Sequence, residues 1–299
     1  MKKEKHLNSL TMPKKMYWFS VPAFFMYMIF WVMPVFQLFH YSFTNFNGVN
    51  RNYKFVGIQN YFSLMKDGTL KAVLPNTVIY TIVLVIFSNL IALGLALLLN
   101  SEIRGKGFYR TAAYIPTLFS AIVIGFIWTY VYMPSDGMIA SLMNMAGMDG
   151  SKFNILASFK TALYAIIGVD IWKHVGTTMI IFLAGLQTID TSLIEAAQMD
   201  GCNAWQMIRN IKLPLISATV TINVVLSVIN GLKAYDYVFI MTNGGPGKST
   251  NTLMYAIYKL AFNEQMMGKS AALSMIAFVL IIAITISMLI FMNKREVEL

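Results

Sequence analysis

Residues 77–99, TVIYTIVLVIFSNLIALGLALLL, decide the fold because this long run contains no charged side chain. A helix rises about 1.5 Å per residue, so the run is long enough to cross a hydrocarbon core of about 30 Å. A second uncharged run, SAALSMIAFVLIIAITISMLIFM, occupies residues 270–292. The sequence therefore predicts helices that span a membrane.

Four further apolar runs extend this pattern along the whole chain. The predicted spans lie at about 16–40, 73–99, 107–133, 160–187, 214–235 and 270–293. We therefore expect an all-α, polytopic membrane protein with six transmembrane helices and a single transmembrane domain over residues 1–299. The fifth span is the weakest by composition, because asparagine, lysine and aspartate interrupt or bound it.

The composition agrees with a membrane protein and argues against several other classes. Hydrophobic residues make up 57% of the chain and charged residues 12%, whereas soluble domains carry about 25% charged residues. The net charge of +10 comes from basic residues that lie mostly between apolar runs. This placement is typical of helix ends beside membrane lipid, and it does not favour nucleic acid as a partner.

Cysteine and histidine usage gives no support for an internal disulfide or a metal site. Cys202 is the single cysteine, so no internal pair can form. The three histidines, at positions 6, 40 and 174, are scattered without the spacing of metal ligands. We also find no Ser/His or paired-carboxylate pattern, so we expect no catalytic residue and no enzyme activity.

Basic residues predict the orientation of the spans. Lysines precede the first run, which is too long for a signal peptide core and has no small-residue cleavage site after it, so we expect a retained helix. When six spans are threaded, the N-terminal tail, the loop 100–110 and the C-terminal stub share one side, and all three are basic. The positive-inside rule makes that side cytoplasmic, together with both termini and residues 188–213. The predicted location is the cell membrane.

Residues 190–216, DTSLIEAAQMDGCNAWQMIRNIKLPLI, form the most informative cytoplasmic stretch. Ser192 and Glu195 have the spacing of a capping box, which predicts a short helix starting near Leu193. Gly201 fits a left-handed stop, and Asn203 with Gln206 fits a second capping box. We expect Pro214 to open the next span. From these rules alone, an ordinary helical hairpin loop remains an alternative.

The same stretch resembles the EAA motif, EAA-x(3)-G-x(9)-I-x-L-P, of binding-protein-dependent ABC importer permeases. The matching positions are Glu195, Ala196, Ala197, Gly201, Ile211, Leu213 and Pro214, with both spacings preserved. The resemblance implies a type I ABC importer permease fold in which residues 190–214 are a coupling segment that docks on an ATPase subunit. Glu195 and Asp200 would then carry charge toward that partner. The alternative role of Glu195 is to cap its own helix.

A loop after the fifth span, AYDYVFIMTNGGPGKSTNTL at 234–253, contains a second resemblance. Its Gly-Lys-Ser end imitates a phosphate-binding loop, but the required glycine is replaced by Thr242, and Pro246 removes an amide donor. The string instead resembles the D-x(5)-T-x-G-G-P segment of carbohydrate-type permeases. The matching residues are Asp236, Thr242, Gly244, Gly245, Pro246 and Thr250.

Polar side chains inside the spans are candidate pathway residues. Asp170 and Lys173 lie three residues apart in the fourth span, where an unpaired charge costs about 2.5–3.5 kcal/mol, so we expect them to pair. The further candidates are Trp172, which could stack on a sugar ring, and the stripe Asn223, Ser227 and Asn230. Interhelical hydrogen bonding is the alternative role for each of these polar groups.

These features together predict the transmembrane subunit of an ATP-driven importer for a sugar, and the expected substrate is an oligosaccharide. The resemblance implies a heterodimer with a second homologous permease subunit, two cytoplasmic ATPase subunits that bind ATP and Mg, and an extracellular or periplasmic sugar-binding protein. No cofactor is expected in this chain. The alternatives are a secondary transporter driven by an ion gradient, which usually carries an internal repeat, and an importer of the same kind for glycerol phosphate.

Overall fold

The computed structural model describes residues 17–50, 52–134 and 136–293, and these ranges are helical apart from loops and one isolated bridge between Thr44 and Phe55. Within them, five helices are long and apolar enough to cross a membrane, and a sharply bent pair makes a sixth crossing if it is counted as one span. The chain is therefore all-α and polytopic. The basic tails used to predict the orientation, with lysines at 2, 3, 5, 14 and 15 and the pair Lys294 and Arg295, lie outside the described residues.

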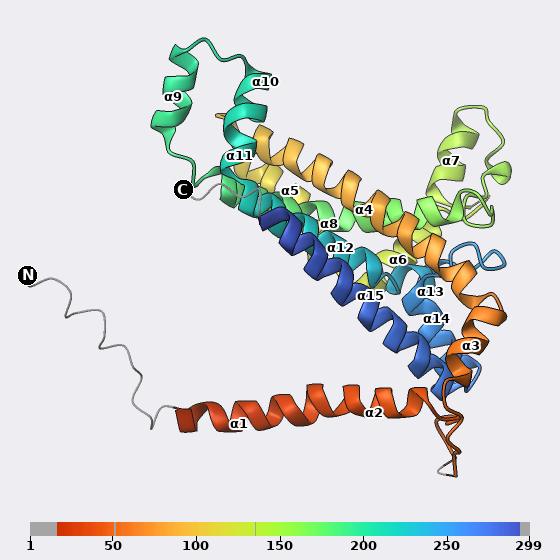
Figure 1. The fold of residues 1–299 in the computed structure, drawn as a ribbon. Helices are drawn as coiled ribbons and strands as arrows, with labels where there is room; N and C mark the ends of the chain where they lie inside the picture. Colours follow the sequence, from red (N-terminus) through yellow and green to blue (C-terminus); the bar gives the residue numbers. More distant parts are fainter. Residues whose placement is uncertain (1–16, 51, 135, 294–299) are drawn as a thin grey trace, which may run out of the picture.

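Three long helices form the centre of the bundle. They are α4 (Thr69–Leu99), α8 (Ala162–Leu186) and α12 (Ser217–Leu232), and α4 packs against both of the others (Figure 1). Past Leu232, the chain continues into α13 (Asp236–Met241), which completes the fifth crossing. The last crossing is α15 (Met267–Asn293), which packs on α12.

Glycines at the crossing points allow these helices to approach closely. A side chain added at Gly176 of α8 would overlap the carbonyl oxygen of Ala113 in α5 (Lys106–Leu118). One added at Gly231 of α12 would lie 2.7 Å from the α carbon of Thr81 in α4. Lipid tails are as apolar as the side chains, so close van der Waals contact replaces the hydrophobic effect as the force that joins the helices.

The third predicted span, 107–133, is not one straight helix. It consists of α5 and α6 (Ala121–Val131), which meet at an angle of 98°. Phe119 and Ser120 between them have extended backbones, and the Ser120 hydroxyl accepts a hydrogen bond from the amide of Val123, which starts α6. Pro116 lies in the last turn of α5, where the helix ends. The expectation of a continuous span was wrong because this cap lies inside an otherwise apolar run.

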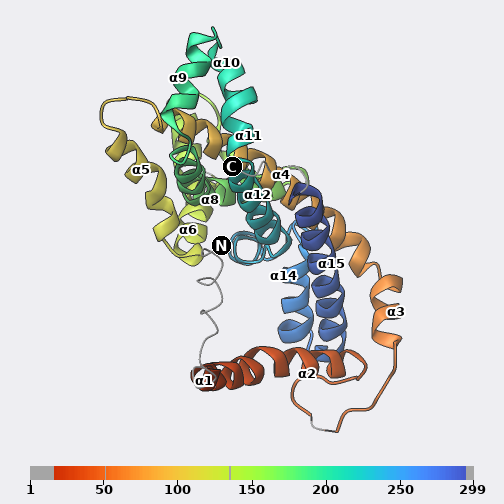
Figure 2. The same cartoon turned by 60° about the vertical axis from the view of Figure 1, so that its left-hand side comes forward.

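The first crossing stands apart from the bundle. It runs through α1 (Tyr17–Tyr27), a π-helical turn η2 (Met28–Val32) and α2 (Met33–Ser42). The end of α2 lies against α15, whereas α1 points away from the other helices in both views (Figures 1 and 2). None of the residues in its most apolar stretch is buried in this chain.

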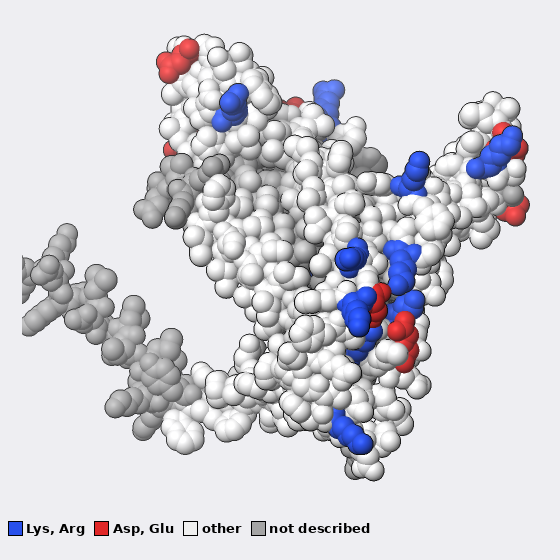
Figure 3. All heavy atoms as spheres, turned by 45° about the vertical axis from the view of Figure 1, so that its right-hand side comes forward, with Lys and Arg blue, Asp and Glu red and all other residues white. Residues whose placement is uncertain are grey.

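Short helices cap the two ends of the bundle. One end carries α3 (Gln59–Lys66), α7 (Met138–Met145), the 3-10 turn η3 (Gly150–Lys152), α14 (Leu253–Tyr258) and the π-helical turn η5 (Lys259–Asn263). The other end carries α9 (Thr191–Met199), α10 (Ala204–Gln206), the π-helical turn η4 (Met207–Lys212) and α11 (Leu213–Leu215). Figure 3 shows charged side chains gathered at these two ends with a broad uncharged surface between them, as a membrane requires.

Gly176 and Gly168 of α8 provide a matched test of the close packing. Nothing lies within 4 Å of a side chain added at Gly168. Gly176→Ala should lower the melting temperature of the purified protein by several degrees, because overpacking costs about 1–3 kcal/mol. Gly168→Ala should leave it unchanged or raise it slightly. Equal melting temperatures of the two variants, measured by thermal unfolding in detergent, would contradict this packing.

Candidate functional site

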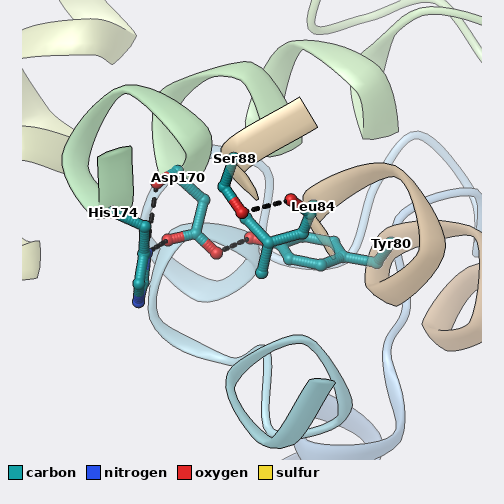
Figure 4. Close-up of polar contacts among 5 residues, drawn as sticks. All are labelled: Tyr80, Leu84, Ser88, Asp170 and His174. Atoms are coloured by element: carbon teal, nitrogen blue, oxygen red, sulfur yellow. Dashed lines mark hydrogen bonds and ion pairs between the residues drawn. The ribbon is translucent and has the colours of Figure 1, made fainter. Parts of the chain in front are cut away.

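The buried carboxylate of Asp170 joins two central helices. The Tyr80 hydroxyl of α4 donates a hydrogen bond of 2.7 Å to Asp170 Oδ2, and His174 Nδ1 lies 2.8 Å from Oδ1 (Figure 4). Asp170 is only 5% exposed, so both of its oxygens need such partners. The charge in the middle of α8 is therefore held by one neighbour on α4 and one on its own helix.

The predicted pair between Asp170 and Lys173 is not formed, and that prediction was wrong. Both carboxylate oxygens already have partners, and His174 is at the i+4 position, where a short, rigid side chain can reach Asp170. Across the described ranges, no ion pair involves Lys173. The lysine is half-buried and borders a cavity instead.

A polar cavity of about 320 Å³ lies beside this carboxylate. It is lined by residues of α4, α6, α8, α12 and α13, namely Tyr80, Ala121, Asp170, Lys173, His174, Asn230, Lys233, Ala234, Tyr235, Asp236 and Tyr237. The Tyr237 side chain is buried, and its hydroxyl has no hydrogen-bond partner among the described residues. An unpaired buried hydroxyl is costly, so the cavity provides polar groups that a bound polar molecule or water would satisfy.

The structure separates the pathway candidates into two groups. Asp170, Lys173 and Asn230 border the cavity. Asn223 and Ser227 lie elsewhere on α12, in interhelical hydrogen bonds: Asn223 Nδ2 donates to the Thr178 carbonyl at 3.3 Å, and Asn89 Nδ2 donates to Ser227 Oγ at 3.1 Å. Trp172 stacks edge-on against Trp128, with ring centroids 5.6 Å apart, and does not border the cavity.

Among the residues that line this cavity, only Asp170, Lys173 and Asn230 were predicted as pathway candidates. Tyr80 and Tyr237 carry no sequence signal, because tyrosine is common in membrane spans and only the fold brings these two to one place. In the sequence, Lys233 only bounds the fifth predicted span, and His174 is one of three scattered histidines. Lys233 lies three residues after Asn230, and His174 lies four residues after Asp170. These helical spacings are the signal that would have placed each of them beside a predicted candidate.

At the other end of α8, the exposed segment 190–216 begins with a different cap from the predicted one. The carboxylate of Asp190, not the hydroxyl of Ser192, accepts the hydrogen bond from the Ser192 amide at 3.0 Å, and α9 starts at Thr191. That amide holds the pKa of the Asp190 carboxyl below its usual range. The prediction failed because aspartate and serine are equally good caps, and the extended backbone of Asp190 decides between them.

Two local predictions in the segment are confirmed and one is wrong. Gly201 has φ +77°, and Asn203 and Gln206 form the reciprocal capping box with two hydrogen bonds of 2.9 Å. Pro214, however, does not open the next span, because helix continues from Ala204 to Leu215 and the break falls at Ile216. The π-helical turn η4 precedes the proline, so its missing N–H falls in an already irregular pattern.

The segment presents an unpartnered apolar tip. Met199 is 89% exposed, Trp205 is 67% exposed, and Leu193 is also exposed, and Figure 2 shows α9 and α10 projecting from the bundle. Of the EAA residues, Glu195, Ala196, Asp200 and Gly201 are exposed, Ala197 is buried, and Ile211, Leu213 and Pro214 are half-buried. Exposed apolar side chains on a polar surface mark a protein contact. The sequence reasoning had not singled out Met199 and Trp205.

The loop motif after the fifth span, at residues 234–253, forms a compact turn. The hydroxyls of Thr242 and Thr250 lie 2.8 Å apart, and Thr250 also donates to the Gly245 carbonyl at 2.8 Å. Gly244 has φ +80°, and a side chain there would overlap the side chain of Asn251. The Gly245–Pro246 peptide is cis. Asp236, the first residue of the motif, starts α13 and borders the cavity.

No group of three or more His, Cys, Asp or Glu side chains in the described ranges is placed to hold a metal ion. Two features with unmet binding capacity are the polar cavity and the apolar tip of α9 and α10. They are connected through the fold, because the segment that carries the tip joins the end of α8 to the start of α12, and both of these helices contribute to the cavity lining.

Comparisons with known proteins give one consistent family. The family described as "Binding-protein-dependent transport system inner membrane component" matches residues 3–295. The "Probable starch degradation products transport system permease protein AmyD" of Thermoanaerobacterium thermosulfurigenes is 31% identical over 95% of this chain and 96% of its own length. The "sn-glycerol-3-phosphate transport system permease protein UgpA" of Agrobacterium fabrum is 29% identical over 97% of this chain and 99% of its own length.

A solved structure shares the fold. It is a bacterial ABC transporter involved in the import of the acidic polysaccharide alginate, and one of its chains matches with a TM-score of 0.83. The match covers 94% of this chain and 95% of that chain at 22% sequence identity. At this identity, the likeness shows the arrangement of helices alone.

The bond between Tyr80 and Asp170 leads to a double-mutant prediction. Hydrogen bonds to charged groups contribute about 1.5–3 kcal/mol, so Tyr80→Phe and Asp170→Asn should be strongly coupled in the free energy of unfolding. The control cycle combines Asp170→Asn with Lys173→Met, and its coupling should be weaker because no ion pair joins those side chains. Both cycles are measured by thermal unfolding in detergent. Stronger coupling in the control cycle would show that Asp170 and Lys173 do interact, as the sequence predicted.

Proposed function

The chain belongs to the binding-protein-dependent transport system inner membrane components, and on that premise we propose that it forms half of the translocation pathway of an ATP-driven sugar importer. The observation that carries the proposal is the polar cavity inside the membrane-spanning bundle. Two of the helices that line it, α8 and α12, are joined by the exposed segment at the opposite end. A binding region and a docking region are thus built on the same helices.

A neutral sugar fits the cavity better than a phosphate does. The lining contains two lysines and two aspartates, so the cavity offers no net positive charge to an anion. It does offer ammonium, amide, carboxylate and hydroxyl groups, which match the mixed donors and acceptors of a sugar. Relatives are named for starch degradation products and for multiple sugars, and others for glycerol 3-phosphate, so the charge balance favours the sugar.

A second permease subunit completes the pathway in this proposal. The first crossing exposes large apolar side chains, including Phe19 and Trp31, and none of the residues in its most apolar stretch is buried by the described part of the chain. A homologous partner would cover part of this helix and provide the opposite wall, as a heterodimer.

ATP hydrolysis is assigned to two cytoplasmic ATPase subunits, which would also bind Mg. The apolar tip of Met199 and Trp205 provides the anchors for one of them, and Glu195 and Asp200 form the charged rim. An extracellular or periplasmic sugar-binding protein would deliver the substrate at the end that carries α3, α7 and α14. A neighbour of known structure, the alginate transporter, was solved in complex with an alginate pentasaccharide-bound periplasmic protein.

The function is tested in proteoliposomes that contain the complex purified with its partner subunits and its binding protein. Uptake of labelled maltotriose, raffinose or cellotriose should require enclosed ATP and the binding protein. It should continue when ionophores remove all ion gradients. Uptake that needs a gradient and not ATP would instead establish a secondary transporter.

Gly201 and Gly147 allow the coupling role to be separated from backbone strain. They have almost the same φ, +77° and +78°, and open space surrounds both. Alanine at either position costs about 1–2 kcal/mol of strain. Gly201→Ala should reduce uptake and the ATPase activity that loaded binding protein stimulates, and Gly201→Asp should nearly abolish both, because it adds a charge at the docking surface. Gly147→Ala should leave both activities near wild type.

Subunit content is the control for this comparison. The Gly201 variants should still co-purify with the ATPase subunits, because the membrane-spanning helices bury far more area than the segment does. Normal stimulated ATPase activity in Gly201→Asp with intact assembly would show that residues 190–214 are only a connecting loop.

The orientation of the chain is proposed from the positive-inside rule, with both termini and α9 in the cytoplasm. With Cys202 replaced, a cysteine at Met199 should react with an impermeant thiol reagent only after the cells are opened. A cysteine at Asp149, in the exposed turn after α7, should react in intact cells. The reverse labelling pattern, read on gels, would invert the topology.

A further inference from the structure

The hydrogen bonds of His174 determine which of its nitrogens carries the proton. Nδ1 lies 2.8 Å from Asp170 Oδ1 and 3.2 Å from the Asp170 carbonyl oxygen. A carbonyl oxygen can only accept a hydrogen bond, and an ionised carboxylate can only accept as well. Nδ1 must therefore be the donor, which leaves Nε2 with a free lone pair when the imidazole is neutral.

The ring is also fixed in direction. Asp170 is held from its other side by the Tyr80 hydroxyl at 2.7 Å, so the carboxylate cannot rotate without losing a bond. Figure 4 shows the far end of the imidazole pointing away from the carboxylate. The His174 side chain is 31% exposed and borders the polar cavity, and no described residue forms a hydrogen bond with Nε2.

The other groups of the cavity show why an acceptor matters there. Lys173 and Lys233 can only donate hydrogen bonds. Asp170 has both oxygens occupied, which leaves the carboxylate of Asp236 and the amide oxygen of Asn230 as the other strong acceptors on the lining. A sugar hydroxyl donates one hydrogen bond and accepts others, so it needs both kinds of partner.

We propose that His174 is a substrate-binding residue whose Nε2 accepts a hydrogen bond from a sugar hydroxyl, and that Asp170 and Tyr80 are positioning residues for it. This inference rests on the proposed function and adds to it a specificity determinant. It predicts selection for a hydroxyl donor at one position of the sugar, because a group that only accepts would leave Nε2 without its partner.

The proposal has a consequence for the pH dependence of transport. Protonation of the imidazole would convert Nε2 into a donor, so uptake should fall as the pH decreases through the titration of His174. The other charged or titratable groups that border the cavity are Tyr80, Asp170, Lys173, Lys233, Tyr235, Asp236 and Tyr237. The His174→Gln variant separates the contribution of the imidazole from these groups, because it retains all of them.

Diethyl pyrocarbonate tests the free lone pair without any sugar, because it acylates only an unprotonated imidazole nitrogen. In the purified complex at pH 7.5 (roughly one unit above the ordinary histidine value), peptide mass spectrometry should find His174 modified in the wild type. Asp170→Asn should alter the rate of modification, because the amide no longer imposes one tautomer. The absence of any reaction at an otherwise folded His174 would show that Nε2 is not free.

Transport kinetics test substrate binding, with maltotriose, raffinose and cellotriose as probes. His174→Phe removes the acceptor and should lower the transport efficiency about 3–10-fold, as expected for one hydrogen bond. His174→Gln retains an acceptor and should recover most of this loss, but the decline of uptake at low pH should disappear. Thr177→Val, one turn further along α8 and away from the cavity, is the matched control and should behave as wild type.

The outcomes separate this inference from the proposed function. If wild-type proteoliposomes take up none of the three sugars, the proposed sugar importer is wrong, while the acylation experiment still decides the state of Nε2. If the wild type transports a probe but His174→Phe matches it in efficiency, the substrate-binding role is refuted. An acid decline that persists unchanged in His174→Gln would refute it as well, because a group other than the imidazole would then set the pH profile.

Discussion

A carboxylate buried in a membrane-spanning helix must be satisfied by hydrogen bonds from the protein itself, and much of this structure follows from that requirement at Asp170. Asp170 is only 5% exposed, so its oxygens need partners from the protein, and the Tyr80 hydroxyl of α4 provides one of them. This bond ties together α4 and α8, two of the three helices at the centre of the bundle. The same carboxylate fixes the imidazole of His174, so one constraint links packing to the surface of the cavity.

Close helix contact is the second requirement, and small residues meet it. Gly176 and Gly231 allow the backbones of α5 and α4 to lie where any side chain would collide. Between these contacts, Asn223, Ser227 and Asn89 form a polar layer that joins α12 to α8 and α4. Such bonds contribute only about 0.6–2 kcal/mol each. Their main effect is therefore to select one arrangement of the helices rather than to add stability.

The sequence predicted well whatever depends on one residue or one local spacing. Uncharged runs identified the spans, Gly201 was expected at positive φ, and the Asn203 box formed as expected. Prediction from the sequence failed where two neighbouring residues can take the same structural role. Asp190 displaced Ser192 as a helix cap, and His174 displaced Lys173 as the partner of Asp170. The cavity was only partly predictable, because Tyr80 and Tyr237 reach it from helices far apart in the chain.

Under the proposed function, the connection between the two candidate sites is mechanical. The exposed segment joins the end of α8 to the start of α12, and these helices carry His174 and Asn230 on the lining of the cavity. Its internal bends are held by the Asp190 cap, Gly201 and the Asn203 box, so the segment should move as a unit. A displacement at α9 would therefore act on both helices at once. The irregular geometry at Ile216 is the place where such a movement can change direction before it reaches α12.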